Sequence, residues 1–292
     1  MSKEEQINVI SANDVITENN ITEKFNVKTY KNALLIGCNY KNSSYALKGC
    51  INDVSNIKQV LTTSYGFDNI TFMTDDTPLK PNKENILAAI KQLLSNANCG
   101  DILFLSFSGH GTNVKGTNVK GTNGHEKDGL DEVIMTIDFD YITDDELNSL
   151  IRGHLKKDVT LFALFDCCHS GTILDLRYQY LDSINVNKNT ENIKHLETEG
   201  NVIMISGFMD RQTIAGAYIK STRSYQGGIT WAFLETLHNN PETTWGELLT
   251  TMRYYLKMAS YSQIPQLSCG KKLDLMLKFS RLFNPLFLCS YR

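Results

Sequence analysis

The sequence lacks any long apolar segment. In its 292 residues, no apolar run approaches the roughly 18 residues that a membrane-spanning helix needs. Residues 1–20 are polar and acidic, so they also lack the apolar centre of a secretion signal. The sequence therefore predicts neither a membrane span nor an export signal.

An excess of basic residues is also missing. The 29 lysine and arginine residues are outnumbered by 32 aspartate and glutamate residues, which gives a formal net charge of -3. Such a chain has no electrostatic footprint for a phosphate backbone, so we do not expect nucleic acid as a partner. A hydrophobic content of 41% and a charged content of 21% are typical of a globular protein.

The cysteines have neither the number nor the arrangement of a disulfide framework. There are seven of them, an odd count, and they are scattered along the chain. In a chain with no secretion signal, this pattern is typical of reduced thiols in a cytosol-like compartment. We therefore expect a cytoplasmic protein.

Apolar and polar runs divide the chain into three parts. Residues 1–30 predict a loosely ordered extension, residues 31–280 a single domain, and residues 281–292 a C-terminal tail. Within the domain, apolar runs of strand length alternate with segments of helical spacing, which favours an α/β fold with a mostly parallel sheet. The predicted strands cover residues 33–36, 70–73, 102–107, 133–137, 159–165 and 202–205, and a last apolar run covers residues 273–279. The predicted helices cover residues 52–63, 82–96, 144–152, 231–237 and 245–258.

Two polar segments interrupt this alternation. Residues 112–124 read TNVKGTNVKGTNG, a five-residue unit repeated almost three times, and residues 177–200 are also polar. The period is too short for a solenoid, and its glycine and asparagine content favours a loop. Both segments therefore predict surface connections within the domain.

Reactive side chains follow two of the predicted strands. The segment LFLSFSGHG ends one strand and places His110 between two glycines, and TLFALFDCCHSG ends another with Cys167, Cys168 and His169. In open parallel sheets, ligands bind at the carboxyl ends of the strands. The separation of 168 − 110 = 58 residues suits one intervening strand and helix, so neighbouring strand ends can bring His110 and Cys168 together.

The two adjacent cysteines allow four interpretations. Zinc requires three or four ligands, usually from spaced pairs such as C-x-x-C, whereas adjacent side chains point apart. A redox pair also usually has the C-x-x-C spacing, and an inert buried thiol is the default for any single cysteine. The fourth interpretation is a nucleophilic thiolate activated by His110, which the glycine-flanked histidine favours.

Four ordered motifs resemble those of the metacaspases, the caspase-fold cysteine peptidases of plants, fungi, protists and bacteria. The motifs are GCINDV at 49–54, SGHG at 108–111, DGLDEV at 128–133 and DCCHSG at 166–171. The similarity covers residues 31–279 and implies a caspase-like peptidase domain, with a mostly parallel central sheet flanked by helices on both faces. The Q-A-C-[RQG]-G signature of true caspases is absent, as is a long proline-rich segment before the domain.

The resemblance assigns the nucleophile to Cys168. The C-H-S-G pattern of the family falls on Cys168, although Cys167 stands where the family usually has serine or alanine. His110 is then the base that takes the thiol proton and later protonates the leaving amine. The backbone N–H groups of Gly111 and Cys168 are the expected oxyanion hole, and we expect His169 to be structural.

The resemblance also implies a specificity pocket. In the family, the positions of Cys50, Asp53, Ser108 and Asp166 line an acidic pocket for the residue before the cut bond. Two carboxylates in a narrow pocket require a cation, so the implied substrates are proteins or peptides with arginine or lysine at that position. True caspases instead prefer aspartate.

Calcium is the cofactor that the resemblance implies, as an activator outside the chemistry. Calcium-activated family members have aspartates at the positions of Asp128, Asp144, Asp145 and Asp175, and Ca²⁺ takes six to eight hard oxygen ligands. From the residues alone, Asp144 and Asp145 are equally consistent with the start of a helix.

The sequence analysis thus predicts a monomeric cysteine endopeptidase that is capable of self-cleavage. An enzyme that cuts after basic residues should cut its own accessible loops, and Lys220 and Arg223 lie in the polar segment YIKSTRSYQGG at 218–228. Two alternatives belong to other classes: a catalytically silent metacaspase-like protein that binds calcium or partners, and a zinc hydrolase.

Overall fold

An eight-stranded sheet forms the centre of the protein. The computed structural model describes residues 29–115, 130–168, 171–180, 189–193, 195–208, 217–219 and 224–283. The strand order is β2-β1-β3-β7-β10-β13-β8-β9. Strands β2, β1, β3, β7 and β10 pair in parallel, and the three strands beyond them pair antiparallel. The bounds are β1 Lys31–Gly37, β2 Asn69–Thr74, β3 Ile102–Ser108, β7 Thr160–Asp166, β8 Tyr178–Tyr180, β9 Thr190–Glu191, β10 Asn201–Phe208 and β13 Ile264–Cys269.

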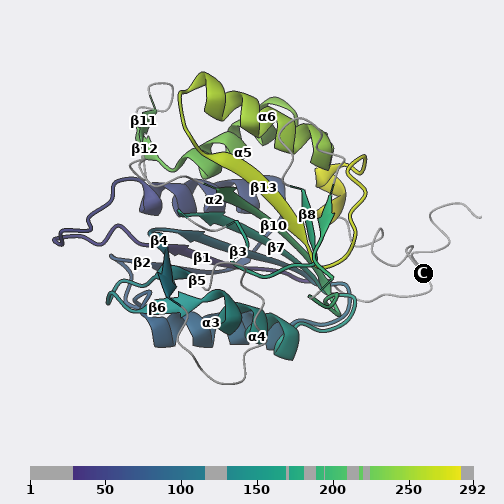
Figure 1. Cartoon of the computed structure of the whole chain (residues 1–292), viewed down its shortest axis with the longest axis horizontal. Helices are drawn as coiled ribbons and strands as arrows, with labels where there is room; N and C mark the ends of the chain where they lie inside the picture. Colours follow the sequence, from purple (N-terminus) through teal and green to yellow (C-terminus); the bar gives the residue numbers. More distant parts are fainter. Residues whose placement is uncertain are drawn as a thin grey trace, which may run out of the picture.

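Helices cover both faces of this sheet (Figure 1). Helices α2 (Cys50–Ser64), α5 (Gly228–Asn239) and α6 (Trp245–Met258) pack on one face, and α3 (Lys83–Ser95) and α4 (Asp144–His154) pack on the other. Two hydrophobic clusters fill the two interfaces, with alternate residues of each strand contributing to opposite clusters. The predicted α/β fold with a mostly parallel sheet and helices on both faces is confirmed.

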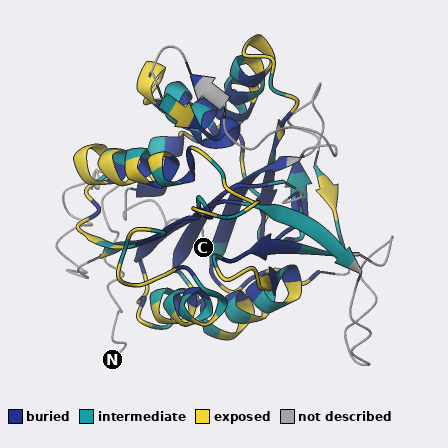
Figure 2. Cartoon of the chain, turned by 90° about the vertical axis from the view of Figure 1, so that its left-hand side faces the viewer, coloured by how far each residue is buried: buried dark blue, intermediate teal, exposed yellow. Residues whose placement is uncertain are grey.

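The central positions of β3 and β7 in the sheet explain why their sequences are so apolar. Every residue of β3 and β7 is buried, because each strand has a neighbour on both sides and a helical layer on both faces. In Figure 2, the strands at the centre of the molecule are mostly dark blue, and the exposed residues lie toward the outside, largely on helices and loops. Phe162 of β7 illustrates the packing: its ring contacts Phe233, Trp245 and Phe279.

Local sequence signals fix where α4 and α6 begin. Thr143 and Glu146 form a capping box at the start of α4, and Thr244 and Glu247 form another at the start of α6. In each box, the threonine hydroxyl and the glutamate carboxylate satisfy backbone N–H groups that have no partner within the helix. The first box therefore fixes the position of the aspartates that open α4.

One predicted strand lies outside the main sheet. Residues 133–137 fall largely in β5 (Leu130–Met135), which pairs antiparallel with β4 (Gly111–Lys115) and β6 (Tyr141–Thr143) in a separate three-stranded sheet. The connection from β3 to β7 therefore carries a short antiparallel sheet and one helix, rather than one strand of the main sheet. As a result, β3 and β7 are direct neighbours.

Two further segments differ from their predicted form. The polar segment 177–200 contributes β8 and β9 to the sheet, and the residues before α5 form the hairpin of β11 (Ala217–Ile219) and β12 (Ser224–Gln226). The last apolar run, 273–279, leads into a 3-10 helix, η1 (Phe279–Phe283). Because Leu282 and Phe283 are buried in the core, the packed structure continues beyond residue 280. Across the described ranges, none of the helices combines the length and the apolar character needed to cross a bilayer.

Candidate active site

The register of β3 and β7 brings the two predicted reactive loops together. Ser108 at the end of β3 pairs with Asp166 at the end of β7. His110 and Cys168 each follow two residues after one of these positions, so both leave the sheet at the same edge. Gly111 lies against the main chain there, because a Cβ atom on it would overlap the carbonyl oxygen of Cys168. The predicted meeting of the two loops is therefore seen in the structure.

His110 is held at both its main chain and its ring. Its backbone N–H donates to Tyr40 Oη at 3.0 Å, and its Nε2 lies 2.8 Å from the carbonyl oxygen of Tyr45. A carbonyl oxygen can only accept a hydrogen bond, so Nε2 carries a proton. In the neutral ring, Nδ1 is then the nitrogen that can accept a proton. The ring is thus prepared to act as a base through Nδ1.

The two adjacent cysteines occupy different environments. Cys167 is 2% exposed and packs in the core cluster that includes α3 and α4, whereas Cys168 is partly exposed. Burial raises the pKa of the Cys168 thiol, and the nearby carboxylate of Asp166 raises it further. Because the thiol is therefore protonated at neutral pH, it needs a base such as His110 to become a nucleophile. Neither cysteine is in a disulfide.

The predicted pocket residues lie together beside the two loops. Asp53, on the first turn of α2, accepts a hydrogen bond from Ser108 Oγ at 2.7 Å and from the Gly227 N–H at 2.9 Å. Asp166 accepts from the Thr230 N–H at 2.7 Å. Cys50, at the start of α2, is also buried, and its thiol has a raised pKa, first because of burial and then because of Asp53.

The two pocket carboxylates are almost completely removed from water. Asp53 is 0% exposed and Asp166 is 6% exposed. Burial raises the pKa of Asp53, and the second carboxylate raises it further; burial also raises the pKa of Asp166. Two buried carboxyl groups that interact in this way cannot both ionise without a large free-energy cost. Burial therefore favours the neutral form of at least one of the two acids.

Gly227, which the sequence analysis did not single out, lies against both acids. Its N–H reaches Asp53, and a Cβ atom on it would overlap the carboxylate of Asp166. Only glycine allows the main chain before α5 to pass this close to both acids. The signal available in the sequence was the Gly227–Gly228 pair directly before a helical run, although nothing local connects that pair to Asp53.

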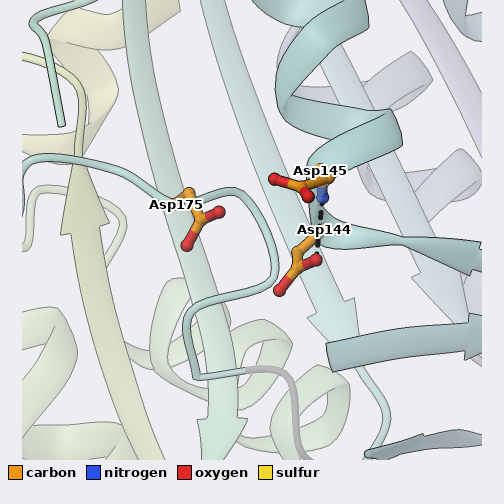
Figure 3. A group of neighbouring side chains, drawn as sticks. All are labelled: Asp144, Asp145 and Asp175. Carbon is orange, nitrogen blue, oxygen red and sulfur yellow. Dashed lines mark hydrogen bonds between the residues drawn. The ribbon is translucent and has the colours of Figure 1, made fainter. Parts of the chain in front are cut away.

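Three of the four predicted calcium ligands form a second acidic cluster. One carboxylate oxygen from each of Asp144, Asp145 and Asp175 lies within 4.8 Å of the others. Figure 3 shows Asp144 and Asp145 at the start of α4, facing Asp175 on the segment that follows β7. Two backbone groups orient Asp144: the Asp145 N–H at 2.8 Å and the Glu132 N–H at 3.2 Å. Asp128 lies outside the described residues.

The charge of this cluster suits a hard divalent cation. Burial raises the pKa of Asp144 to about 6, and Asp145 and Asp131 add smaller increases. The pKa of Asp131 is itself raised, first by burial and then by Asp145. Crowded carboxylate oxygens are the ligands that calcium prefers, so the residues present fit the ion.

A cavity of about 680 Å³ lies elsewhere in the protein. Its lining includes Thr160 and Asn201, the first residues of β7 and β10, together with Trp245. Thr160 and Asn201 lie at the amino ends of their strands, whereas His110 and Cys168 follow the carboxyl ends of β3 and β7. The cavity is therefore separate from the reactive loops, despite its size.

Comparison with known proteins identifies the family. Residues 31–177 match the family model described as "Metacaspase, peptidase C14 domain". The chain belongs to the metacaspase family. Metacaspase-1 of Kluyveromyces lactis is 34% identical over 85% of this chain and 68% of its own length, and Metacaspase-1B of Neurospora crassa is 36% identical over the same shares. This metacaspase therefore spans about two thirds of the length of these relatives.

Solved structures agree with this fold. A protein from Geobacter sulfurreducens has a TM-score of 0.60 at 22% identity, over 85% of this chain and 97% of that chain. Family membership makes the chain a cysteine-type endopeptidase that acts on proteins or peptides. The individual roles of His110, Gly111 and Cys168 stay predictions, as do the monomeric state and the cytoplasmic location. Lys220 and Arg223 lie outside the described residues.

Replacing each of the two cysteines separately should distinguish the nucleophile. Cys168→Ala should abolish cleavage of a proteome-derived peptide library, and Cys167→Ala should retain most of it, since Cys167 lies in the core. His110→Ala should lose about as much as Cys168→Ala, because the two groups act as a unit. New peptide termini are counted by mass spectrometry. Robust turnover by Cys168→Ala would show that the assignment is wrong.

Proposed function

We propose that this metacaspase hydrolyses peptide bonds after arginine or lysine, that calcium activates it, and that it cleaves itself. The observation that carries the specificity is the buried pair Asp53 and Asp166. In the described part of the chain, the partners of these carboxylates are hydroxyl, side-chain amide and backbone N–H groups, not lysine or arginine side chains. A substrate cation would supply the missing positive charge.

The charge of the pocket also opposes the alternative specificity. A substrate with aspartate before the cut bond would add a third carboxylate to two buried ones, at a cost of several kcal/mol. A guanidinium can instead donate parallel hydrogen bonds to a carboxylate, and an ammonium can pair as a point charge. Cleavage after basic residues is therefore the specificity that this pocket supports.

The proposed reaction uses the two strand-end loops. His110 Nδ1 takes the proton of the Cys168 thiol, and the thiolate sulfur attacks the carbonyl carbon of the substrate. The backbone N–H groups of Gly111 and Cys168 donate to the oxyanion that forms. The imidazolium then protonates the leaving amine as the C–N bond breaks. Water, deprotonated by His110, hydrolyses the thioester and restores the thiol.

Calcium would act on the arrangement of the loops rather than on the reacting atoms. The acidic cluster joins the start of α4 to Asp175, on the segment that follows the nucleophile loop. Asn148 of α4 already donates to the Leu174 carbonyl at 2.7 Å, so the two segments are in contact. A bound calcium ion would neutralise the crowded carboxylates and tighten this connection. The ion would supply charge neutralisation and would take no part in bond cleavage.

Removal of the Asp53 carboxylate should lower the rate of cleavage after arginine and lysine without lowering the stability of the fold. Asp53→Asn should lower cleavage after arginine and lysine by about 100-fold or more, because the substrate cation loses a desolvated partner. It should not create cleavage after aspartate. Rates are measured with matched fluorogenic peptides that end in Arg, Lys or Asp, and the exposed control Asp68→Asn should behave like the wild type.

The same variant controls for unfolding. The folded-state pKa of Asp53 is raised, so the wild type loses stability as pH rises from the ordinary aspartate value through the raised one. Asparagine removes this cost while keeping an acceptor for Gly227 and a partner for Ser108. Asp53→Asn should therefore melt no lower than the wild type at pH 7. If a folded Asp53→Asn variant cleaved peptides ending in Arg or Lys at the wild-type rate, Asp53 would not contact the substrate residue before the cut bond.

Calcium should raise the rate of peptide cleavage with an affinity on the order of 10⁻⁴ to 10⁻³ M, because the ligands do not form an EF-hand loop. Replacing Asp144 and Asp145 together by alanine should remove the stimulation without removing the Thr143–Glu146 cap of α4. The matched control, Asp68→Ala with Asp76→Ala, removes two exposed acids elsewhere. Equal wild-type rates in calcium and in chelator would reject the proposal.

Self-cleavage should occur after Lys220 or Arg223. These residues follow Ile219 of β11 and precede Ser224 of β12, which pair across the hairpin, so a cut between them leaves the main sheet intact. Terminal sequencing of fragments formed in calcium should find these two sites, and Cys168→Ala should form none. Lys220→Gln with Arg223→Gln should remove the fragments, whereas the exposed pair Lys156→Gln with Lys157→Gln should not. Cuts only after acidic residues would contradict the proposal.

A further inference from the structure

Tyr40 is buried beside the predicted catalytic histidine. It follows β1, and it is 1% exposed. Its φ of 50° lies in the left-handed region, which is uncommon for a bulky residue and costs conformational free energy. Its ring centroid lies 5.0 Å from the imidazole of His110. A strained, buried tyrosine next to a reactive group requires a physical reason.

The tyrosine hydroxyl closes a ring of hydrogen bonds around the His110 main chain. Tyr40 Oη accepts from the His110 N–H at 3.0 Å and donates to the Met135 carbonyl at 2.6 Å. The Met135 N–H in turn donates to the His110 carbonyl at 3.0 Å. Both backbone groups of His110 are therefore fixed, one by Tyr40 directly and one by the residue that Tyr40 binds.

This ring of hydrogen bonds also explains why residue 109, directly before His110, is a glycine. A Cβ atom on Gly109 would lie 2.8 Å from Tyr40 Oη and 2.8 Å from Phe107 Cζ. Glycine thus lets the main chain approach the hydroxyl closely enough for the His110 N–H to bind it. The Tyr45 carbonyl fixes the imidazole itself through Nε2, so main chain and ring are anchored separately.

We propose that Tyr40 is a positioning residue for catalysis, whose hydroxyl sets the place of the His110 main chain and so aims Nδ1 at the Cys168 thiol. Tyr40 does not touch the reacting atoms. Its effect therefore belongs to the rate of the chemical step rather than to substrate binding, because its hydroxyl binds the main chain of His110 and Met135 and not the carboxylates of Asp53 or Asp166.

Tyr40→Phe removes only the hydroxyl. With the best-cleaved peptide of the library used for Cys168→Ala, kcat should fall about 10-fold to 100-fold while KM stays within about twofold. The rate at which iodoacetamide alkylates Cys168 should fall as well, since a misplaced imidazole takes the thiol proton less readily. The alkylation measurement needs no substrate and does not depend on the proposed preference for arginine or lysine.

Tyr180→Phe is the matched control. Tyr180 is also 1% exposed, and its hydroxyl also bridges two backbone groups, by donating to the Leu273 carbonyl at 2.9 Å and accepting from the Leu273 N–H at 3.2 Å. Both variants lose the same kind of buried hydroxyl, so both should lower the melting temperature by a similar amount. Only Tyr40→Phe should lower kcat. Equal kcat in Tyr40→Phe and Tyr180→Phe would make Tyr40 merely structural and overturn the proposal.

A measurement on the chain with Tyr40 intact covers the case in which Tyr40→Phe does not fold. Hydrogen exchange in the Cys168→Ala protein should show the His110 amide to be protected, although it lies in the loop between β3 and β4. Exchange at the rate of an open loop would show that the hydroxyl does not hold this amide, and would overturn the proposal.

Discussion

The pairing of Ser108 with Asp166 is the constraint on which the rest of the site depends. This register aligns the carboxyl ends of β3 and β7, so the loops that carry His110 and Cys168 start side by side. It also brings Ser108 to the Asp53 carboxylate on α2. A shift of one residue would turn every side chain of one strand to the opposite face and separate these groups. The reactive loops and the buried pair Asp53 and Asp166 therefore share one structural origin.

The site stores electrostatic free energy that the fold elsewhere must offset. Asp53 and Asp166 are buried with raised pKa values, and the Cys168 thiol is shifted in the same direction. Each shift means that the charged form is less stable than it would be in water. The aromatic packing around Phe162, on the other face from the small sheet, supplies apolar burial that does not depend on ionisation. Such a division is typical of sites that trade stability for chemistry.

Close approach of the main chain is the second feature that the site requires. Gly109 makes room for the Tyr40 hydroxyl, Gly111 for the Cys168 carbonyl, and Gly227 for the Asp166 carboxylate. In each case, a Cβ atom would force the neighbouring group away. The glycines of this enzyme therefore act through the space that they leave, rather than through flexibility alone.

The sequence by itself determined the features that local chemistry controls. Continuous apolar runs predicted the buried strands β3 and β7, the helical spacing of residues 144–152 predicted α4, and the strand-end motifs identified His110 and Cys168. Tertiary structure alone decided which distant groups meet. Tyr40 is hydrogen-bonded to Met135, 95 residues away, and Gly227 to Asp53, 174 residues away. Strand β5 pairs in the small sheet rather than in the main one. These contacts depend on strand order and register, which short-range patterns do not encode, because pairing is set by the packing of the whole sheet.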